Sequence, residues 1–311
     1  MNNLKSALRQ LRNAPGFTFV AVLTLALGIG ANAAIFSVIN GVLLRPLPFE
    51  EPERLMRLYQ QSDNFPKASW AAGQFFSMHK DNASFEAVGG WQAANFNLSE
   101  DGADPERIEG AAVTHDFTRV LRVNPVKGRS FNQDEFTPGG DAVVLISMGL
   151  WQQRFAADPK ILGRSLFISG RPRLVVGVMP DDFTFPGKSQ VWAPFAPDEE
   201  NRTRRDLHNV QAFGRLKPGV TYEQAQADLK TLAARYAKEY AATDADWRCV
   251  AYPMLQDAVV QIRPALNVLL ASVVALLLIA CANIANLLLA RAATRQREMS
   301  LRAALGASRF Q

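Results

Sequence analysis

Two long apolar runs constrain the fold of this 311-residue chain more than any other feature. Residues 17–44 form a run of 28 residues and residues 265–290 a run of 26, and neither contains Asp, Glu, Lys, Arg or His. A helix needs only about 20 apolar residues to cross the hydrocarbon core of a bilayer. The sequence therefore predicts two transmembrane helices, at 17–44 and 265–290, with membrane lipid as a partner of both.

Charge is distributed unevenly around these runs. The net charge of +5 divides into +3 over residues 1–16, −2 over residues 45–264 and +4 over residues 291–311. A nucleic-acid-binding protein would carry its basic excess on the folded domain, so this pattern argues against nucleic acid as a partner. Short basic flanks typically stay on the cytoplasmic side of a membrane. We therefore expect both termini, 1–16 and 291–311, in the cytoplasm and an extracytoplasmic domain at 45–264.

The first run permits two other interpretations. Residues 28–33, GIGANA, match a dinucleotide-binding fingerprint. That site needs an amphipathic helix after the glycines, whereas this chain stays apolar to Leu44. The same residues resemble a signal-peptidase site, but the run is longer than the 7–15 apolar residues of a signal peptide. We expect no cofactor here and an uncleaved membrane anchor.

Small and polar residues in both runs indicate contacts between membrane helices. Small residues spaced three or four apart let helices approach closely, and asparagine at membrane depth usually faces another helix. The predicted helix-packing residues are Ala26, Gly30, Ala34, Ser37, Gly41, Asn283 and Asn286.

Residues 45–264 are long enough for a sizeable core and have the pattern of an α/β domain. The predicted strands are 54–60, 95–98, 108–113, 142–146, 165–169, 174–178 and 208–216. Helices are predicted at 74–80 and 148–155, and a capping box at 221–224, TYEQ, predicts a longer helix from Thr221. The proline-rich segment 180–197 is predicted to be a loop or an edge structure.

No catalytic motif is present in the sequence. His79, His115 and His208 lack metal-binding spacing, and the chain contains neither a nucleophile-elbow serine nor a Walker A loop. Cys249 falls in the outer domain and Cys281 in the second apolar run, too far apart to form a disulfide. We expect a chain that is not an enzyme and that holds no metal or cofactor.

Several motifs, taken in their order along the chain, resemble a known family. Residues 25–40, LALGIGANAAIFSVIN, resemble the first span of MacB-like/FtsX-like ABC transporter permeases. Residues 150–155, LWQQRF, and 176–180, VGVMP, resemble the MacB-like periplasmic core domain. Residues 283–291, NIANLLLAR, and 297–309, REMSLRAALGASR, resemble the second span and the start of the FtsX-like permease region. The opening is most similar to the large duplicated permeases.

The resemblance implies an architecture and a membrane. It implies an α/β extracytoplasmic domain, made of a porter-like part and an inserted lobe at roughly 100–204, between two transmembrane α-helices in the bacterial inner membrane. Family half-units have four spans, whereas this chain stops after two, so we expect a truncated chain.

The resemblance also implies a function. The chain would be the permease subunit of a mechanotransmission-type ABC transporter, coupling ATP hydrolysis by a separate cytoplasmic ABC ATPase to motion of the outer domain in export or efflux. Glu298, Arg302 and Gly306 are the ATPase-coupling candidates. A second permease half or a homodimeric copy, and a membrane-fusion protein, are further partners that it allows. A two-span membrane sensor with an extracytoplasmic ligand domain is the alternative.

Overall fold

The structure is a computed structural model and describes residues 15–39, 47–99, 105–140, 142–260 and 263–304. The chain divides into two compact units. One comprises Met1–Arg45 and Ala258–Gln311 and is called the helical unit below. The other, Pro46–Asp257, is called the sheet domain. Each unit is described by itself.

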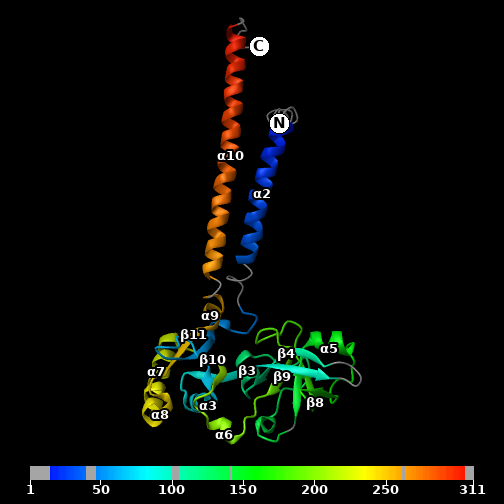
Figure 1. Cartoon of the computed structure of the whole chain (residues 1–311), viewed down its shortest axis with the longest axis vertical. Coiled ribbons are helices and arrows are strands. Elements are labelled where there is room, and N and C mark those ends of the chain that lie inside the picture. The colour runs from blue at the N-terminus through cyan, green and yellow to red at the C-terminus, as the bar shows by residue number, and fades with distance from the viewer. Residues whose placement is uncertain (1–14, 40–46, 100–104, 141, 261–262, 305–311) are drawn as a thin grey trace. The chain divides into compact units, whose positions relative to one another are not determined.

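The sheet domain alternates short helices with strands (Figure 1). Its strands are β1 (Leu55–Gln61), β2 (Trp70–Ala71), β3 (Phe85–Ser99), β4 (Glu106–Val113), β5 (Lys127–Gly128), β6 (Val143–Ile146), β7 (Ser165–Ile168), β8 (Arg171–Val178), β9 (Val191–Pro194), β10 (His208–Leu216) and β11 (Arg248–Pro253). Its helices are η2 (Pro52–Arg54), α3 (Ala72–Asp81), α4 (Phe117–Leu121), η3 (Gln133–Phe136), α5 (Met148–Phe155), α6 (Glu199–Thr203), α7 (Tyr222–Glu239) and α8 (Ala241–Asp244). The helix α9 (Met254–Val260) follows β11, and the helical unit contains α2 (Pro15–Ile39) and α10 (Arg263–Ala304).

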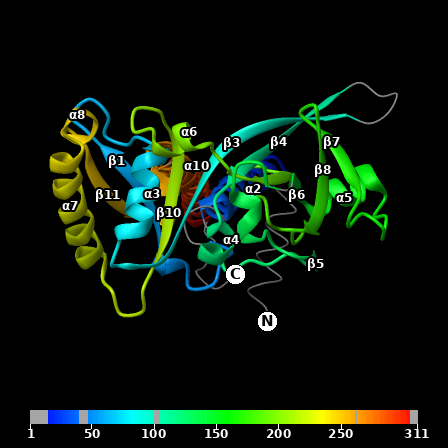
Figure 2. The ribbon, with the colours of Figure 1, turned by 90° about the horizontal axis from the view of Figure 1, so that it is seen from below.

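The strands form one mixed sheet in the order β11-β1-β10-β3-β4-β9-β6-β8-β5. The pairs β4–β9 and β6–β8 are parallel, and the other neighbours along this order are antiparallel. The strand β2 joins β10, and β7 joins β3 and β8. Figure 2 shows α7 beside β11 and β1 at one end of the sheet and α5 beside β6 and β8 at the other.

Both faces of the sheet are covered, which explains why several strands are apolar almost throughout. Successive side chains of a strand point to opposite faces. Met56 of β1 and Ala212 of β10 pack in a cluster with α3 and α7, whereas Leu55 and Phe213 pack in a second cluster with α4 on the other face. A third cluster, around Trp151 of α5, fills the space beside β6 and β8.

Local sequence signals positioned several elements correctly. Thr221 accepts a hydrogen bond from the Gln224 backbone N–H and Gln224 caps it in return, so the predicted capping box starts α7. The Ser147 side chain accepts from the Leu150 N–H and begins α5 at the predicted residue. The strands predicted at 165–169 and 174–178 are present as β7 and β8, which pair as a hairpin, and Gly170 in its turn has a positive φ of 76°.

The prediction for residues 180–197 was wrong in part. This segment contains β9, which lies inside the sheet between β4 and β6 rather than at an edge. Trp192 of β9 is 1% exposed. The strand has only four residues, the last of them Pro194, and is too short for a periodic signal. The strand β3 is also longer than predicted, because it pairs with β10 along its first half and with β4 along its second.

The sheet domain is one compact unit in the structure. Its sheet is continuous from β11 to β5. The strands of the porter-like part and of the inserted lobe at roughly 100–204 therefore belong to one sheet, and the boundary between the two parts stays a prediction.

The helical unit supports one candidate membrane span directly. Within the described residues, Pro264–Asn286 of α10 is long and apolar enough to cross a bilayer. The apolar part of α2, Thr18–Ala34, is shorter, and residues 40–44 of the first predicted span lie outside the described residues. The span at 17–44 stays a prediction. Helix α10 has 42 residues, or about 63 Å at 1.5 Å per residue, and continues well past the apolar stretch.

Candidate functional site

The chain leaves the sheet through β11 and α9, and packing fixes this exit. Pro253, at the end of β11, lies opposite Met56 of β1. Met254 begins α9, is 5% exposed and belongs to the aromatic cluster that contains Phe117 and Phe213. The start of α9 is therefore part of the domain core.

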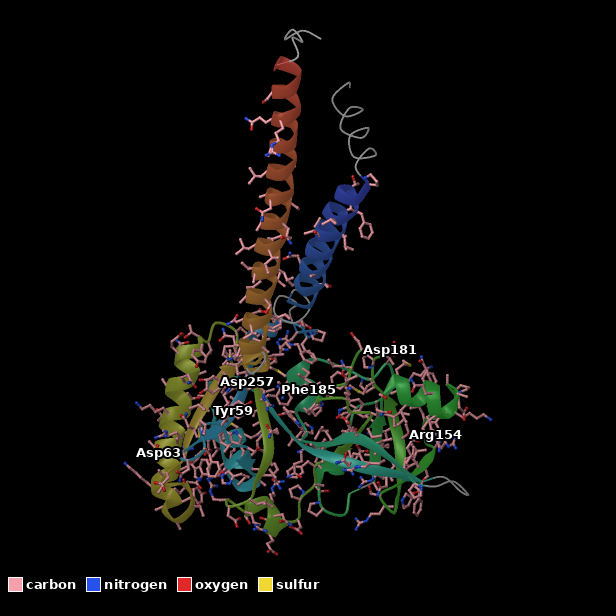
Figure 3. All side chains as sticks on the ribbon, turned by 45° about the horizontal axis from the view of Figure 1, so that its top comes forward. Tyr59, Asp63, Arg154, Asp181, Phe185 and Asp257 are labelled. Atoms are coloured by element: carbon pink, nitrogen blue, oxygen red, sulfur yellow. The ribbon has the colours of Figure 1, made fainter. Side chains whose placement is uncertain are left out.

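Asp257 of α9 is the acceptor of a charged network from the sheet. The Tyr59 hydroxyl donates to Asp257 Oδ2 at 2.6 Å, and Lys67 Nζ donates to Oδ1 at 2.5 Å. Arg57 Nε lies 3.7 Å from Oδ2. The Asp257 side chain is 10% exposed, so water screens these contacts weakly. Figure 3 shows Tyr59 and Asp257 together at this position. The network binds α9 to β1 and the loop that follows it.

Aromatic rings restrict the two basic side chains further. Lys67 Nζ lies 4.4 Å from the centroid of the Tyr252 ring, and Arg57 Cζ lies 4.4 Å from that of Trp91. Arg57 Nη2 also donates to Gln211 Oε1 at 2.7 Å. Cation–π contacts of desolvated groups are worth about 1–2 kcal/mol each. Both cations are therefore held from several sides around Asp257.

The network also shifts the pKa values of Tyr59 and Lys67. Burial raises the pKa of Tyr59, the charge of Arg57 opposes this, and the hydrogen bond to Asp257 raises the pKa again. Burial lowers the pKa of Lys67, but the hydrogen bond and the charge of Asp257 outweigh it and leave this pKa above its ordinary value. At neutral pH Tyr59 is therefore neutral and Lys67 is charged, and in these states both donate to Asp257.

The chain enters the sheet domain beside a second charged cluster, centred on Glu51. Arg54 Nη1 and Arg122 Nη1 each donate to Glu51 Oε2 at 2.6 Å. Arg215 Nη1 donates to the Glu51 carbonyl at 3.2 Å, and Arg215 Nε donates to the Val120 carbonyl at 2.8 Å. Arg215 is fully buried. These contacts bind the entering segment to β10 and α4.

The Asp257 network and the Glu51 cluster, called the two anchors below, each bind a segment at an end of the sheet domain to its sheet. Glu51 immediately precedes η2 and β1, and Asp257 belongs to the helix that follows β11, so both segments are fixed to neighbouring strands of one sheet. The Asp257 side chain is 10% exposed, so breaking its contacts would leave an unpaired charge in a poorly solvated place, whereas the Glu51 carboxylate is 41% exposed and water screens its ion pairs. Within the sheet domain, both segments are therefore connected to the sheet by side-chain contacts as well as by the chain itself. No sequence motif marks this site, because its members come from distant positions.

In the helical unit, α2 and α10 lie side by side and run antiparallel (Figure 1). Gly28 and Ala280 are buried where the helices meet, and a Cβ built on Gly28 would lie 3.6 Å from the Ala280 Cβ. The predicted stripe is elsewhere. Its described members are exposed, and they are Ala26, Gly30, Ala34, Ser37, Asn283 and Asn286.

Helix geometry explains this difference. Two residues along a helix correspond to about 200° of rotation, so the stripe through Ala26 and Gly30 lies opposite the face that carries Gly28. The stripe therefore does not form the contact between α2 and α10. Its packing against another membrane helix stays a prediction, and Gly41 lies outside the described residues.

The ATPase-coupling candidates lie at the end of the chain. Glu298 and Arg302 belong to the last turns of α10, but their side chains lie outside the described part of the structure. Gly306 lies entirely outside it. Their role stays a prediction.

The structure brings together two histidines that are 36 residues apart in the sequence. His79 Nε2 lies 2.9 Å from Asp116 Oδ2, and His115 Nδ1 lies 3.1 Å from Asp116 Oδ1. Burial raises the pKa of Asp116, but the hydrogen bond and charge of His79, followed by those of His115, leave this pKa below its ordinary value. Within the described residues, no three His, Cys, Asp or Glu side chains are grouped to hold a metal ion.

Comparison with known proteins adds a family likeness to this geometry. The sequence profile of the MacB-like periplasmic core domain matches residues 18–232. A domain of a Porphyromonas gingivalis protein named as a permease superposes with a TM-score of 0.52 at 16% identity, covering 66% of this chain and 93% of that one. The periplasmic region of MacB from Actinobacillus actinomycetemcomitans gives 0.50 at 15% identity, covering 74% and 98%. These two likenesses concern the fold. No curated protein matches the sequence.

Proposed function

The chain belongs to the MacB-like periplasmic core domain family, and from this premise we propose that it is the permease subunit of an ABC transporter of the mechanotransmission type. A separate cytoplasmic ATPase would hydrolyse ATP, and this chain would transmit the resulting motion to its extracytoplasmic domain. The chain itself would catalyse no reaction. Export or efflux is the direction of transport that the proposal implies.

The anchoring of α9 by Asp257 is the observation that carries the proposal. A permease of this type needs a stiff connection between the helix that crosses the membrane and the domain that moves. Helix α10 follows α9 after two residues, and α9 is bound to β1 through Tyr59 and to the loop after β1 through Lys67. The Glu51 cluster fixes the start of the sheet domain, through contacts that are more exposed to water. Movement of the two membrane helices would therefore reach the sheet at two points.

The partners follow from the same proposal. Two membrane helices do not enclose a complete transporter, and the exposed stripe of α2 is available to a second permease half or to a second copy of this chain. The basic end of α10, with Glu298 and Arg302, would contact the ATPase in the cytoplasm. A membrane-fusion protein would continue an export path beyond the extracytoplasmic domain.

Co-purification tests the proposal. The tagged full chain, extracted in mild detergent from its own cells, should bring down a protein that contains a Walker A loop and hydrolyses ATP. Arg302→Glu should reduce this recovery because it reverses a charge in the proposed contact, whereas Arg171→Glu, on an exposed strand residue of the sheet domain, should not. Recovery of a histidine kinase or response regulator without an ATPase would instead support the two-span sensor.

A further inference from the structure

Two adjoining hollows lie around the side chains of α3 and α6, which are neighbours in Figures 1 and 2. One has a volume of about 260 Å³ and reaches Thr114, His115 and Phe136. The other has about 420 Å³ and reaches Lys80 and Tyr240. Phe76, His79 and Arg202 line both, so the hollows meet at these three residues. Their volumes lie near the lower end of the range for small-molecule sites, about 300–1,000 Å³.

The meeting point combines flat aromatic surface with a positive charge. The Phe76 and Phe195 rings stack with centroids 6.4 Å apart and an interplanar angle of 9°. Arg202 Cζ lies 4.1 Å from the centroid of the Phe76 ring. No acidic side chain within the described part of the chain forms an ion pair with Arg202. A cation that rests on an aromatic face without a carboxylate partner can bind an anion.

A close backbone contact fixes Arg202 over this surface. The Gly73 N–H at the start of α3 donates to the Arg204 carbonyl at 2.8 Å. A Cβ at Gly73 would lie only 2.5 Å from the Thr203 carbonyl oxygen, so this approach requires glycine. The segment that carries Arg202 is therefore docked on the same helix that carries Phe76. The backbone that carries Arg202 is therefore part of the packed fold, whereas the Arg202 side chain itself is exposed and accessible to a ligand.

Basic side chains outnumber acidic ones in the lining of the two hollows. Lys80, Arg202 and Arg205 contribute positive charge, and among the described residues that line the two hollows Glu199 is the one acidic residue. Arg205 is engaged, because its Nε lies 3.1 Å from Asp244 Oδ1. Lys80 and Arg202 remain for a ligand. The lining of the smaller hollow is mainly aromatic, with Phe75, Phe76, Phe136 and Phe195.

We propose that this site binds a small organic anion with a flat apolar body, such as an aromatic carboxylate. The ring would lie against Phe76 and Phe195, and the anionic group would bind Arg202. His79 and His115 line the smaller hollow in orientations fixed by Asp116, which limits the shapes that fit. The inference concerns binding alone and holds whether or not the chain transmits motion for an ATPase.

Equilibrium dialysis of radiolabelled 2-naphthoate tests the proposal. The full chain is used in detergent, and an equal concentration of empty micelles in a parallel cell corrects for partition into detergent. The expected result is saturable binding of one naphthoate per chain, with 2-naphthamide, which has the same ring without the charge, at least tenfold weaker. Loss of a charge-assisted hydrogen bond corresponds to roughly a tenfold change in affinity.

Matched variants locate the site. Arg202→Gln should weaken naphthoate binding about tenfold, and Phe76→Leu about fivefold through loss of the stacked ring. Arg204→Gln is the control, since Arg204 pairs with Asp206 and lines neither hollow. Arg202 is exposed, so its replacement leaves the fold intact. Binding no greater than that of empty micelles, equal affinity for the amide, or equal weakening by both arginine variants would each overturn the proposal.

Discussion

Replacing Asp257 by alanine removes the acceptor on which Tyr59, Lys67 and Arg57 converge. A lost hydrogen bond to a charged group costs about 1.5–3 kcal/mol, and unpairing a buried charge costs about 3–5 kcal/mol. Lys67 is 32% exposed and can recover solvation, whereas Arg57 is 12% exposed and cannot recover it fully. We therefore expect Asp257→Ala to reduce the unfolding free energy of the sheet domain by about 3 kcal/mol.

Thermal unfolding followed by tryptophan fluorescence measures this loss. The five tryptophans all belong to the sheet domain, so their signal reports this unit even in the full detergent-solubilised chain; they are Trp70, Trp91, Trp151, Trp192 and Trp247. For a domain of this size, a Tm shift of about 2–4 °C accompanies each kcal/mol, so the expected decrease is about 6–12 °C. Asp257→Asn, which keeps the shape and one acceptor oxygen, should lower the Tm by a smaller amount.

Asp63 provides the matched control. It pairs with Arg248 Nη2 at 2.7 Å, but its side chain is 91% exposed, and exposed pairs contribute little to stability. Asp63→Ala should leave the Tm unchanged. An Asp257→Ala protein that melts with the wild type, or a decrease equal to that of Asp63→Ala, would refute the argument that α9 is fixed to the sheet through Asp257.

Three further predictions concern other parts of the sheet domain. The pKa of Asp116 is lower in the folded protein than its unfolded value near 3.8, so the Asp116 carboxylate stabilises the fold above pH 3.8 and this stabilisation is lost as the pH falls through the folded pKa. Asp116→Asn should therefore weaken the decrease of Tm at acid pH. Burial raises the pKa of the Cys249 thiol to about 12, so iodoacetamide at pH 8 should alkylate Cys249 only in denaturant, as mass spectrometry of the digested protein can show; rapid native alkylation would contradict its burial. Gly73→Ala places a Cβ against the backbone of the α6 segment and should destabilise the domain by about 1–3 kcal/mol, measured by thermal unfolding beside Gly149→Ala, whose Cβ would have the Ser147 Oγ at 3.9 Å as its one neighbour within 4 Å.

Sequence reasoning succeeded where a feature is encoded by neighbouring residues. The capping box at Thr221 is a signal of four residues, and α7 begins there. The hairpin of β7 and β8 turns at two adjacent residues with positive φ, Ser169 at 51° and Gly170 at 76°. Long apolar runs similarly identify the helix at Pro264–Asn286, since length and hydrophobicity alone define it.

The anchors could not be predicted because distant segments create them. Tyr59 and Asp257 are separated by 198 positions, and their contact exists only because β1 and β11 are neighbours in the sheet. His79 and His115 share Asp116 for a similar reason, although their sequence spacing resembles no known motif. Long-range pairing of strands decides these contacts, and local periodicity contains no information about it.

The helix-packing stripe shows a second limit of prediction from residue spacing. Small residues occur on two faces of α2, one through Gly30 and one through Gly28, and spacing alone does not identify the face that meets α10. The side chain of Ala280 on the partner helix determines that Gly28 is the buried glycine. The packing role of the stripe through Gly30 stays a prediction.

The orientation of the chain in the membrane tests the central claim most directly. In a background without native cysteines, Asp63→Cys places an exposed thiol on the sheet domain, and Ser300→Cys places one near the end of α10. In intact spheroplasts, a membrane-impermeant maleimide should label Asp63→Cys at once and Ser300→Cys only after permeabilisation. Labelling of Ser300→Cys from outside, or of Asp63→Cys only after lysis, would contradict a permease whose sheet domain lies outside the membrane and whose ends contact a cytoplasmic ATPase.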